Sequence, residues 1–223
     1  MNERNRQVKD YICNHFCDDL PPMSQALLRS QEAGLKEIQV SEPVGKLLYL
    51  LAKLVKPKKI LEIGTLGGYS ALWLSKALEE GGQLITIECD PKHAKIAHKN
   101  IFLAGKQDQI TIRQGFAAEV LQEMIESREG PFDLIFLDAD KVGYPAYLEP
   151  CLKLARSGTL LLCDNLIPKR GVIGQPDPRD TEAVTIYTFN QLIANHPQLE
   201  SIPLTTVSAD NGRLDALGLC LVK

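Results

Sequence analysis

The chain has 223 residues, a formal net charge of −3 and a hydrophobic content of 44%. This length and composition predict one globular α/β domain with a buried core and argue against a disordered chain. The acidic balance argues against broad electrostatic capture of nucleic acid or of an anionic membrane, so small-molecule chemistry is the favoured class of function.

The start of the chain is polar and lacks the apolar segment of a signal peptide, and no apolar run reaches membrane length. We therefore expect a cytoplasmic protein with no membrane partner. The 6 cysteines are scattered without the paired spacing of a zinc site. Reduced thiols are expected for a protein of this compartment.

The N-terminal region, residues 1–40, is expected to form a helical cap or an interface segment. Residues 4–17 and 23–34 show amphipathic helical periodicity on either side of Leu20-Pro21-Pro22. Neither helix carries an obvious catalytic pair. Residues 41–223 are the expected binding and catalytic core, and this region begins with a third helix that Pro57 ends.

From Lys58 onward, short apolar runs alternate with helical segments. This alternation predicts right-handed crossovers and a sheet with helices on both faces. The predicted strands are 60–63, 84–88, 110–112, 134–137 and 159–163, and the helices between them begin near Ser70, Pro91, Ala117 and Tyr144. A loop rich in proline and glycine then leads to a predicted helix over 181–195 and to strands over 199–207 and 214–222.

A glycine-rich loop joins the first predicted strand to the following helix. Gly64 and Gly67 allow the backbone to approach a ligand, and the helix start offers unpaired N–H groups. The loop lacks the full glycine spacing of dinucleotide-binding proteins, and by itself an ordinary strand-to-helix turn explains it equally well. Glu88 ends the second strand, where a carboxylate accepts hydrogen bonds from both hydroxyls of a ribose. Together the two features predict a ribose-containing ligand.

Hard oxygen donors follow two other predicted strands. Asp138 comes directly after the 134–137 run, and Asp164 and Asn165 follow the 159–163 run. Parallel strands bring these ends to one edge of the sheet, where the oxygens could hold a small divalent cation. Each acid alone could instead cap a loop, and Lys141 alone would be a surface lysine; the joint pattern favours a cation site. Alternation turns Asp140 away from Asp138.

These segments resemble the S-adenosylmethionine-dependent, divalent-cation-dependent O-methyltransferases of the caffeoyl-CoA and catechol type. The resemblance rests on residues 60–74, on Leu137-Asp138-Ala139-Asp140-Lys141 and on Asp164-Asn165, and it extends from about residue 40 to the C-terminus. It implies a Rossmann-like, seven-stranded, mostly parallel sheet with the last strand antiparallel, commonly in a homodimer. It also implies S-adenosylmethionine as methyl donor and Mg²⁺ or a similar divalent cation.

The resemblance also implies roles for individual residues. Those similar to positions of the donor pocket are Val40, Glu62, Gly64, Thr65, Ser70, Glu88, Gly115, Phe116, Ala117 and Asp138. Glu62 would meet the methionine ammonium, Glu88 the ribose, and the turn at Gly115-Phe116-Ala117 the adenine edge. Asp138, Asp164 and Asn165 match the metal ligands. Lys141 matches the proposed general base and forms, with Asp138, the expected catalytic pair.

Elementary acid–base chemistry agrees with this interpretation. A phenol has a pKa of about 10, so only about one molecule in a thousand is ionised near neutral pH. A cation that binds two adjacent oxygens stabilises the phenolate and orients it toward the sulfonium methyl group. The first hypothesis is therefore methyl transfer to one hydroxyl of a vicinal diol on an aromatic ring, such as a catechol.

Other hypotheses remain open at this point. One keeps the donor and the cation but has a hydroxylated uridine in tRNA as acceptor. Lys169-Arg170 and Arg179 could contact the phosphates of such an RNA or bind a charged small acceptor. The favoured interpretation is that these side chains only face solvent. A nonenzymatic S-adenosylmethionine-binding module is disfavoured by the intact set of two acids and an amide. A nicotinamide-dependent oxidoreductase is disfavoured by the glycine spacing.

Overall fold

The computed structural model describes residues 3–17, 20–169, 174–208 and 213–223. Seven strands form its central sheet. The strands are β1 Lys59–Ile63, β2 Gln83–Glu88, β3 Ile110–Gln114, β4 Leu134–Leu137, β5 Leu160–Cys163, β6 Leu199–Val207 and β7 Leu214–Val222. The helices are α1 Glu3–Phe16, α2 Pro21–Glu32, α3 Glu42–Val55, α4 Tyr69–Ser75, α5 Pro91–Leu103, α6 Ala117–Glu126, the short 3₁₀ helix η1 Lys141–Gly143, α7 Tyr144–Lys153 and α8 Thr181–Asn195.

The strands lie in the order β3-β2-β1-β4-β5-β7-β6. Strands β1 to β5 pair in parallel with one another, whereas β7 is antiparallel to both β5 and β6. This arrangement confirms the expected mostly parallel sheet with an antiparallel last strand. Ile63 is in register with both Ile87 and Leu137, and Leu137 with Cys163. The segments that follow β1, β2, β4 and β5 therefore begin at one common edge of the sheet.

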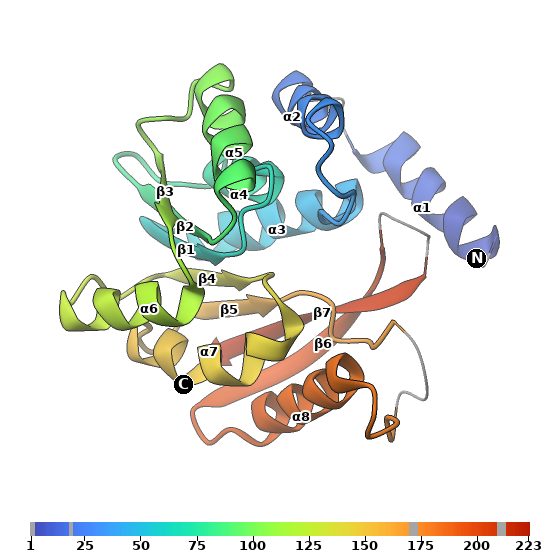
Figure 1. Ribbon diagram of the computed structural model, residues 1–223, viewed down its shortest axis with the longest axis vertical. Helices are drawn as coiled ribbons and strands as arrows, with labels where there is room; N and C mark the ends of the chain where they lie inside the picture. Colours follow the sequence, from blue (N-terminus) through green and yellow to red (C-terminus); the bar gives the residue numbers. More distant parts are fainter. Residues whose placement is uncertain (1–2, 18–19, 170–173, 209–212) are drawn as a thin grey trace.

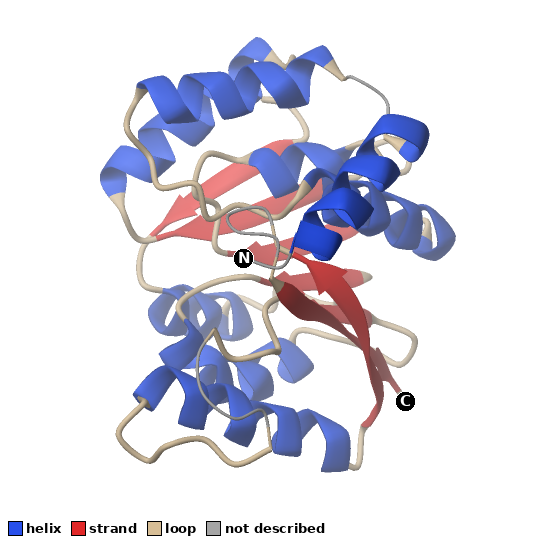
Figure 2. Cartoon of the chain, turned by 90° about the vertical axis from the view of Figure 1, so that its right-hand side faces the viewer, coloured by secondary structure: helices blue, strands red, loops and turns tan. Residues whose placement is uncertain are grey.

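Two helical layers cover the sheet, with α1 to α5 on one side and α6 to α8 on the other (Figures 1 and 2). Each layer contributes its own core cluster. Leu48, Trp73 and Ile101 belong to the first cluster, and Leu121 and Phe189 to the second. The strands between them are almost fully buried, as their continuous apolar sequences predict.

The N-terminal helices differ slightly from the sequence prediction. Pro21 and Pro22 form the first turn of α2 instead of separating two helices. Proline is favoured there because the first N–H groups of a helix have no partner within the helix and the ring presets φ. Among the described residues, no helix combines the length and the apolar character needed to cross a membrane.

Gly64 lies very close to the backbone of Asp138, at the edge of the sheet where the parallel strands end. Its φ is +100°, and a Cβ atom added there would overlap the carbonyl oxygen of Asp138. Gly81 provides a matched comparison, because its φ is +72° and nothing lies within 4 Å of an added Cβ atom.

We expect Gly64→Ala to lower the free energy of unfolding by about 2 to 5 kcal/mol, since it adds steric overlap to backbone strain. Gly81→Ala should cost only the strain, about 1 to 2 kcal/mol. Urea denaturation of the two variants measures the difference. Equal losses would show that the approach of Gly64 to Asp138 is not a steric constraint.

Candidate active site

Backbone hydrogen bonds hold the ends of four strands together. The N–H of Gly64 donates to Ile87 at 3.0 Å, that of Asp138 to Ile63 at 2.8 Å, and that of Asp164 to Leu137 at 3.0 Å. The parallel ladder therefore continues one residue beyond each strand. It fixes the backbone of the loops that carry the predicted site residues.

A cavity of about 390 Å³ opens at this edge of the sheet. Its volume lies in the range of small-molecule sites. The predicted site residues that line it are Val40, Gly64, Thr65, Ser70, Glu88, Gly115, Phe116, Ala117, Asp138, Lys141, Asp164 and Asn165. The structure thus brings together every predicted site residue except Glu62, which is fully buried and does not line the cavity.

Glu62 is connected to the cavity wall by two hydroxyl groups. Thr86 Oγ1 donates to Glu62 Oε2 at 2.6 Å, and the hydroxyl oxygens of Thr65 and Thr86 are 2.5 Å apart. When Glu62 is ionised, Thr86 gives its hydrogen to the carboxylate, and Thr65 then donates to Thr86.

The second oxygen of Glu62 has no hydrogen-bond partner among the described residues. Burial raises the pKa of Glu62 to about 8, the nearby hydroxyls of Ser70 and Thr86 lower it in part, and the negative charges of Asp138 and Glu88 add smaller increases. A buried carboxylate with an unpartnered oxygen is suited to a cationic group of a ligand, whose charge would favour the ionised form.

Glu88 is held by the glycine-rich loop and by the start of α5. Its Oε2 accepts from the backbone N–H groups of Thr65 at 3.3 Å and Leu66 at 2.7 Å, and its Oε1 accepts from that of Asp90 at 2.9 Å. A carboxylate offers about four acceptor positions. Three backbone donors fix its orientation. His93 Nδ1 lies 3.6 Å from Oε1, beyond hydrogen-bond distance, so about one position is left for a hydroxyl group in the cavity.

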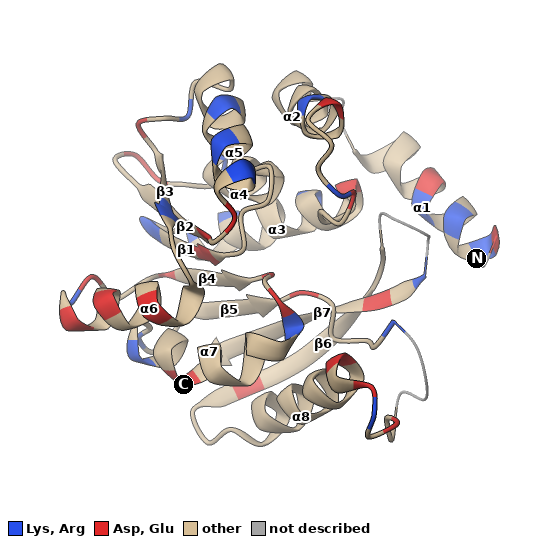
Figure 3. Ribbon diagram, in the orientation of Figure 1, with Lys and Arg blue, Asp and Glu red and all other residues tan. Residues whose placement is uncertain are grey.

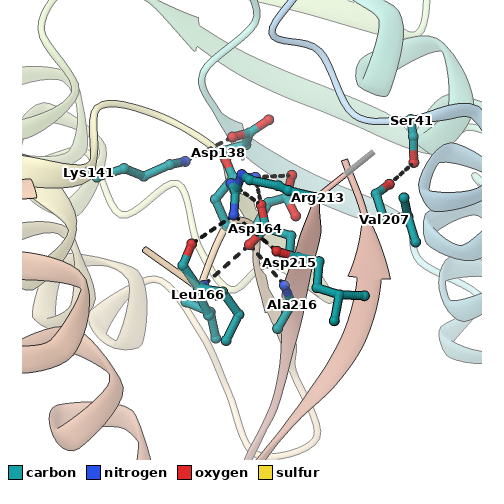
Figure 4. A network of polar contacts seen from close by, with 12 residues as sticks. Ser41, Asp138, Lys141, Asp164, Leu166, Val207, Arg213, Asp215 and Ala216 are labelled. Carbon is teal, nitrogen blue, oxygen red and sulfur yellow. Dashed lines mark hydrogen bonds and ion pairs between the residues drawn. The ribbon is translucent and has the colours of Figure 1, made fainter. Parts of the chain in front are cut away.

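Two carboxylates and an amide converge where β4 and β5 end. Asp164 is 5% exposed, and burial together with the charge of Asp138 raises its pKa to about 8. Asn165 Nδ2 donates to Asp164 Oδ2 at 3.2 Å. The backbone of Asn165 is left-handed, with φ at 60°. Figure 4 shows Asp138 and Asp164 in one polar network with Lys141.

Lys141 is part of this network and not a solvated surface lysine. Its Nζ donates to Asp138 Oδ1 at 3.1 Å and to the hydroxyl of Tyr144 at 2.6 Å. Tyr144 is fully buried, and its hydroxyl lies 3.1 Å from the carbonyl oxygen of Leu137 and 3.0 Å from that of Asp164. Burial raises the pKa of Tyr144 well above its ordinary value, so it acts as a neutral phenol that anchors Lys141 to the ends of β4 and β5.

Asp140 points to other partners, as the alternation predicts. Its Oδ2 accepts from the N–H of Gly143 at 2.8 Å, and its Oδ1 accepts from the Tyr147 hydroxyl at 2.7 Å. Asp140 therefore caps η1, the short helix that begins with Lys141. Its carboxylate stabilises the turn that places Lys141 beside Asp138.

The sequence interpretation missed Asp215 and Arg213. Asp215 is 1% exposed, lines the cavity and forms an ion pair with Arg213 (Figure 4). An acid near the start of the apolar run 214–222 is a signal that could have identified it.

The arrangement has the donor types of a hard-cation site. Among the described residues, no group of three or more His, Cys, Asp or Glu side chains is placed to hold a metal ion. The predicted ligand set differs from such a group, because it contains two carboxylates and the amide of Asn165. Hard cations accept amide oxygens as well as carboxylates. The pKa of Asp164 stays raised, mainly by burial and by the charge of Asp138, although the positive charge of Lys141 partly offsets these effects.

The basic residues of the loop after β5 have different surroundings. Lys169 is exposed and lines the cavity. Arg179 forms an ion pair with Asp177 at 2.6 Å. Arg170 lies outside the described residues.

Comparison with known proteins agrees with this geometry. The family described as O-methyltransferase matches residues 17–212. A catechol O-methyltransferase from Niastella koreensis is 40% identical over 98% of this chain and 100% of its own length. A catechol O-methyltransferase from Mycobacterium tuberculosis is 37% identical over 97% of this chain and 95% of its own length. The crystal structure of an O-methyltransferase from Bacillus cereus in complex with SAH has a TM-score of 0.94 and 37% identity, and covers all of both chains.

The raised pKa values of Glu62 and Asp164 predict how stability depends on pH. Both are about 8 in the folded protein, against 4.5 and 3.8 for the unperturbed groups. Between these values the folded protein binds more protons than the unfolded chain, so its free energy of unfolding should fall as pH rises from about 5 to 8.

Glu62→Gln should remove the contribution of one group, up to about 1.4 kcal/mol per pH unit. Urea denaturation of the ligand-free, chelator-treated proteins between pH 5 and 8 checks this slope. The variant should gain stability relative to the native chain as pH rises. Parallel curves would contradict the buried, ionisable state of Glu62.

Proposed function

The chain belongs to the O-methyltransferase family, and we propose that it methylates one hydroxyl of a vicinal aromatic diol with the help of a divalent cation. The coarser activity, S-adenosylmethionine-dependent O-methyl transfer, is that of the family and agrees with the SAH-bound relative. The observation that supports the finer proposal is the convergence of Asp138, Asp164 and Asn165 on the cavity that the glycine-rich loop also lines. The two relatives named catechol O-methyltransferase support the same acceptor class.

The donor lies, in this proposal, between the glycine-rich loop and the end of β4. The unpartnered oxygen of Glu62 suits the methionine ammonium, and the remaining acceptor position of Glu88 suits a ribose hydroxyl. Phe116 is 67% exposed and lines the cavity, so its ring can cover the adenine.

Asp138, Asp164 and Asn165 would hold the cation. Bound there, it would lower the pKa of an acceptor hydroxyl and help to orient a vicinal diol. Vicinal hydroxyls are the acceptor chemistry that uses both effects.

The Nζ atom of Lys141 is the group that accepts the proton of the attacking hydroxyl. The acceptor oxygen forms a bond to the methyl carbon while the bond from that carbon to sulfur breaks. The sulfur keeps the electron pair, so the sulfonium becomes a neutral thioether. Tyr144 holds the amine at the edge where both reactants meet.

The uridine acceptor has weaker support. Arg179 is engaged by Asp177, and Figure 3 shows basic residues on α5, acidic residues on α6 and both signs on α1. Among the described residues, this mixed distribution gives no support to a single basic surface for RNA. The homodimer stays a prediction from the resemblance.

We expect methylated product when the protein is supplied with S-adenosylmethionine, Mg²⁺ and a catechol, as measured by mass spectrometry. EDTA should stop turnover, and Asp164→Ala should abolish it while leaving S-adenosylhomocysteine binding largely intact, because the donor pocket is built from other residues. Undiminished activity in EDTA would exclude the role of the cation. A panel that includes tRNA distinguishes the acceptor classes, and donor binding without turnover of any acceptor would indicate a nonenzymatic module.

Lys141→Ala should lower kcat near neutral pH by about 10²- to 10⁴-fold, the usual contribution of a general base. The loss should shrink at high pH, where the acceptor ionises without help. A pH–rate profile of both proteins measures this. A loss that is the same at every pH would contradict the role of Lys141 as base.

A further inference from the structure

Asp215 is a buried carboxylate whose hydrogen-bonding capacity is filled by the protein itself. Its Oδ1 accepts from the backbone N–H groups of Ile167 at 3.2 Å and Ala216 at 2.9 Å. Its Oδ2 accepts from Asn165 Nδ2 at 2.9 Å and from the guanidinium of Arg213. Since a carboxylate has about four acceptor positions, Asp215 has none left for a cation. Asp215 can therefore influence a cation in the cavity only through one of its hydrogen-bond partners.

Asn165 is the partner that belongs to the proposed cation site. Its Nδ2 carries two hydrogens, one donated to Asp164 Oδ2 at 3.2 Å and one to Asp215 Oδ2 at 2.9 Å. The amide oxygen Oδ1 is then the atom that remains for a cation, which binds oxygen and not an NH₂ group. If the amide group were rotated by 180°, so that Oδ1 and Nδ2 exchanged places, its oxygen would face the carboxylates of Asp164 and Asp215.

We propose that Asp215 is a positioning residue of the cation site, which holds the Asn165 amide with its oxygen, and not its nitrogen, available for coordination. This inference rests on the cation dependence proposed above. A cation bound to Asp164 competes for the oxygen that now accepts from Asn165. Asp215 lies outside the ligand set, so it remains the acceptor that keeps the amide in orientation.

The test is calorimetric titration with Mg²⁺ in the presence of S-adenosylhomocysteine, which requires no turnover. Asp215→Asn should weaken cation affinity by about 10- to 100-fold, as is usual for partners that orient metal ligands. Glu182→Gln is the matched control, because Glu182 lines the same cavity and the substitution removes the same charge. It should leave cation affinity unchanged. Affinity for S-adenosylhomocysteine without cation, together with the thermal unfolding midpoint, verifies that each variant is folded.

Introducing Asp215→Asn into a protein that already carries Asn165→Asp separates the orienting effect of Asp215 from the effect of its charge. In Asn165→Asp, the side chain at this position has two equivalent oxygens and needs no orienting partner. Adding Asp215→Asn there should cost no affinity, or should increase it by removing repulsion. If Asp215→Asn does not fold, Asp215→Ser, which keeps an acceptor for the backbone N–H groups, is measured in the same way.

The outcomes are distinct. A native chain that binds no Mg²⁺ overturns the proposed cation dependence itself. A native chain that binds Mg²⁺ while Asp215→Asn binds it equally well overturns only the positioning role. Equal losses for Asp215→Asn and Glu182→Gln, or equal losses in both backgrounds at position 165, identify a general charge effect and also overturn it.

Discussion

The common register of the parallel strands is the constraint on which the site depends. Ile63, Leu137 and Cys163 lie side by side, so the residues that follow them emerge together. Hydrogen bonds from the N–H groups of Asp138 and Asp164 to the preceding strands extend this order into the loops. Gly64 is required at the same place because a side chain there would meet the backbone of Asp138. The geometry of the site is thus set by backbone contacts before any side chain contributes.

Burying acidic side chains at this edge of the sheet costs free energy, and the protein compensates some of these carboxylates better than others. Glu88 and Asp215 are neutralised by backbone N–H groups or by a guanidinium. Glu62 and Asp164 are compensated only in part, Glu62 by hydroxyl groups and Asp164 by the charge of Lys141, and their pKa values rise to about 8. The two least compensated carboxylates are those that the proposal assigns to the ligand ammonium and to the cation. A positive charge on a ligand would favour the ionised form of both carboxylates.

Much of this arrangement could be predicted from local sequence. Apolar runs of three to five residues identified the five parallel strands. The residues directly after them supplied most of the predicted site, because topology brings strand ends together. Asp215 escaped the prediction since it lies within an antiparallel strand far along the chain, where only tertiary pairing reveals its neighbour Asn165. The anchoring of Lys141 by Tyr144 escaped for a similar reason. A tyrosine at the start of an apolar helix is equally compatible with simple packing, and its hydroxyl partners are two carbonyl groups on different strands.

The left-handed backbone of Asn165 restricts which residues evolution can place there. Glycine tolerates that conformation best but has no side-chain oxygen, whereas most residues with a suitable oxygen are strained in it. Asparagine and aspartate are the two types that satisfy both demands, and only asparagine does so without adding a further negative charge to the cluster. Backbone conformation and electrostatics therefore both favour asparagine at position 165.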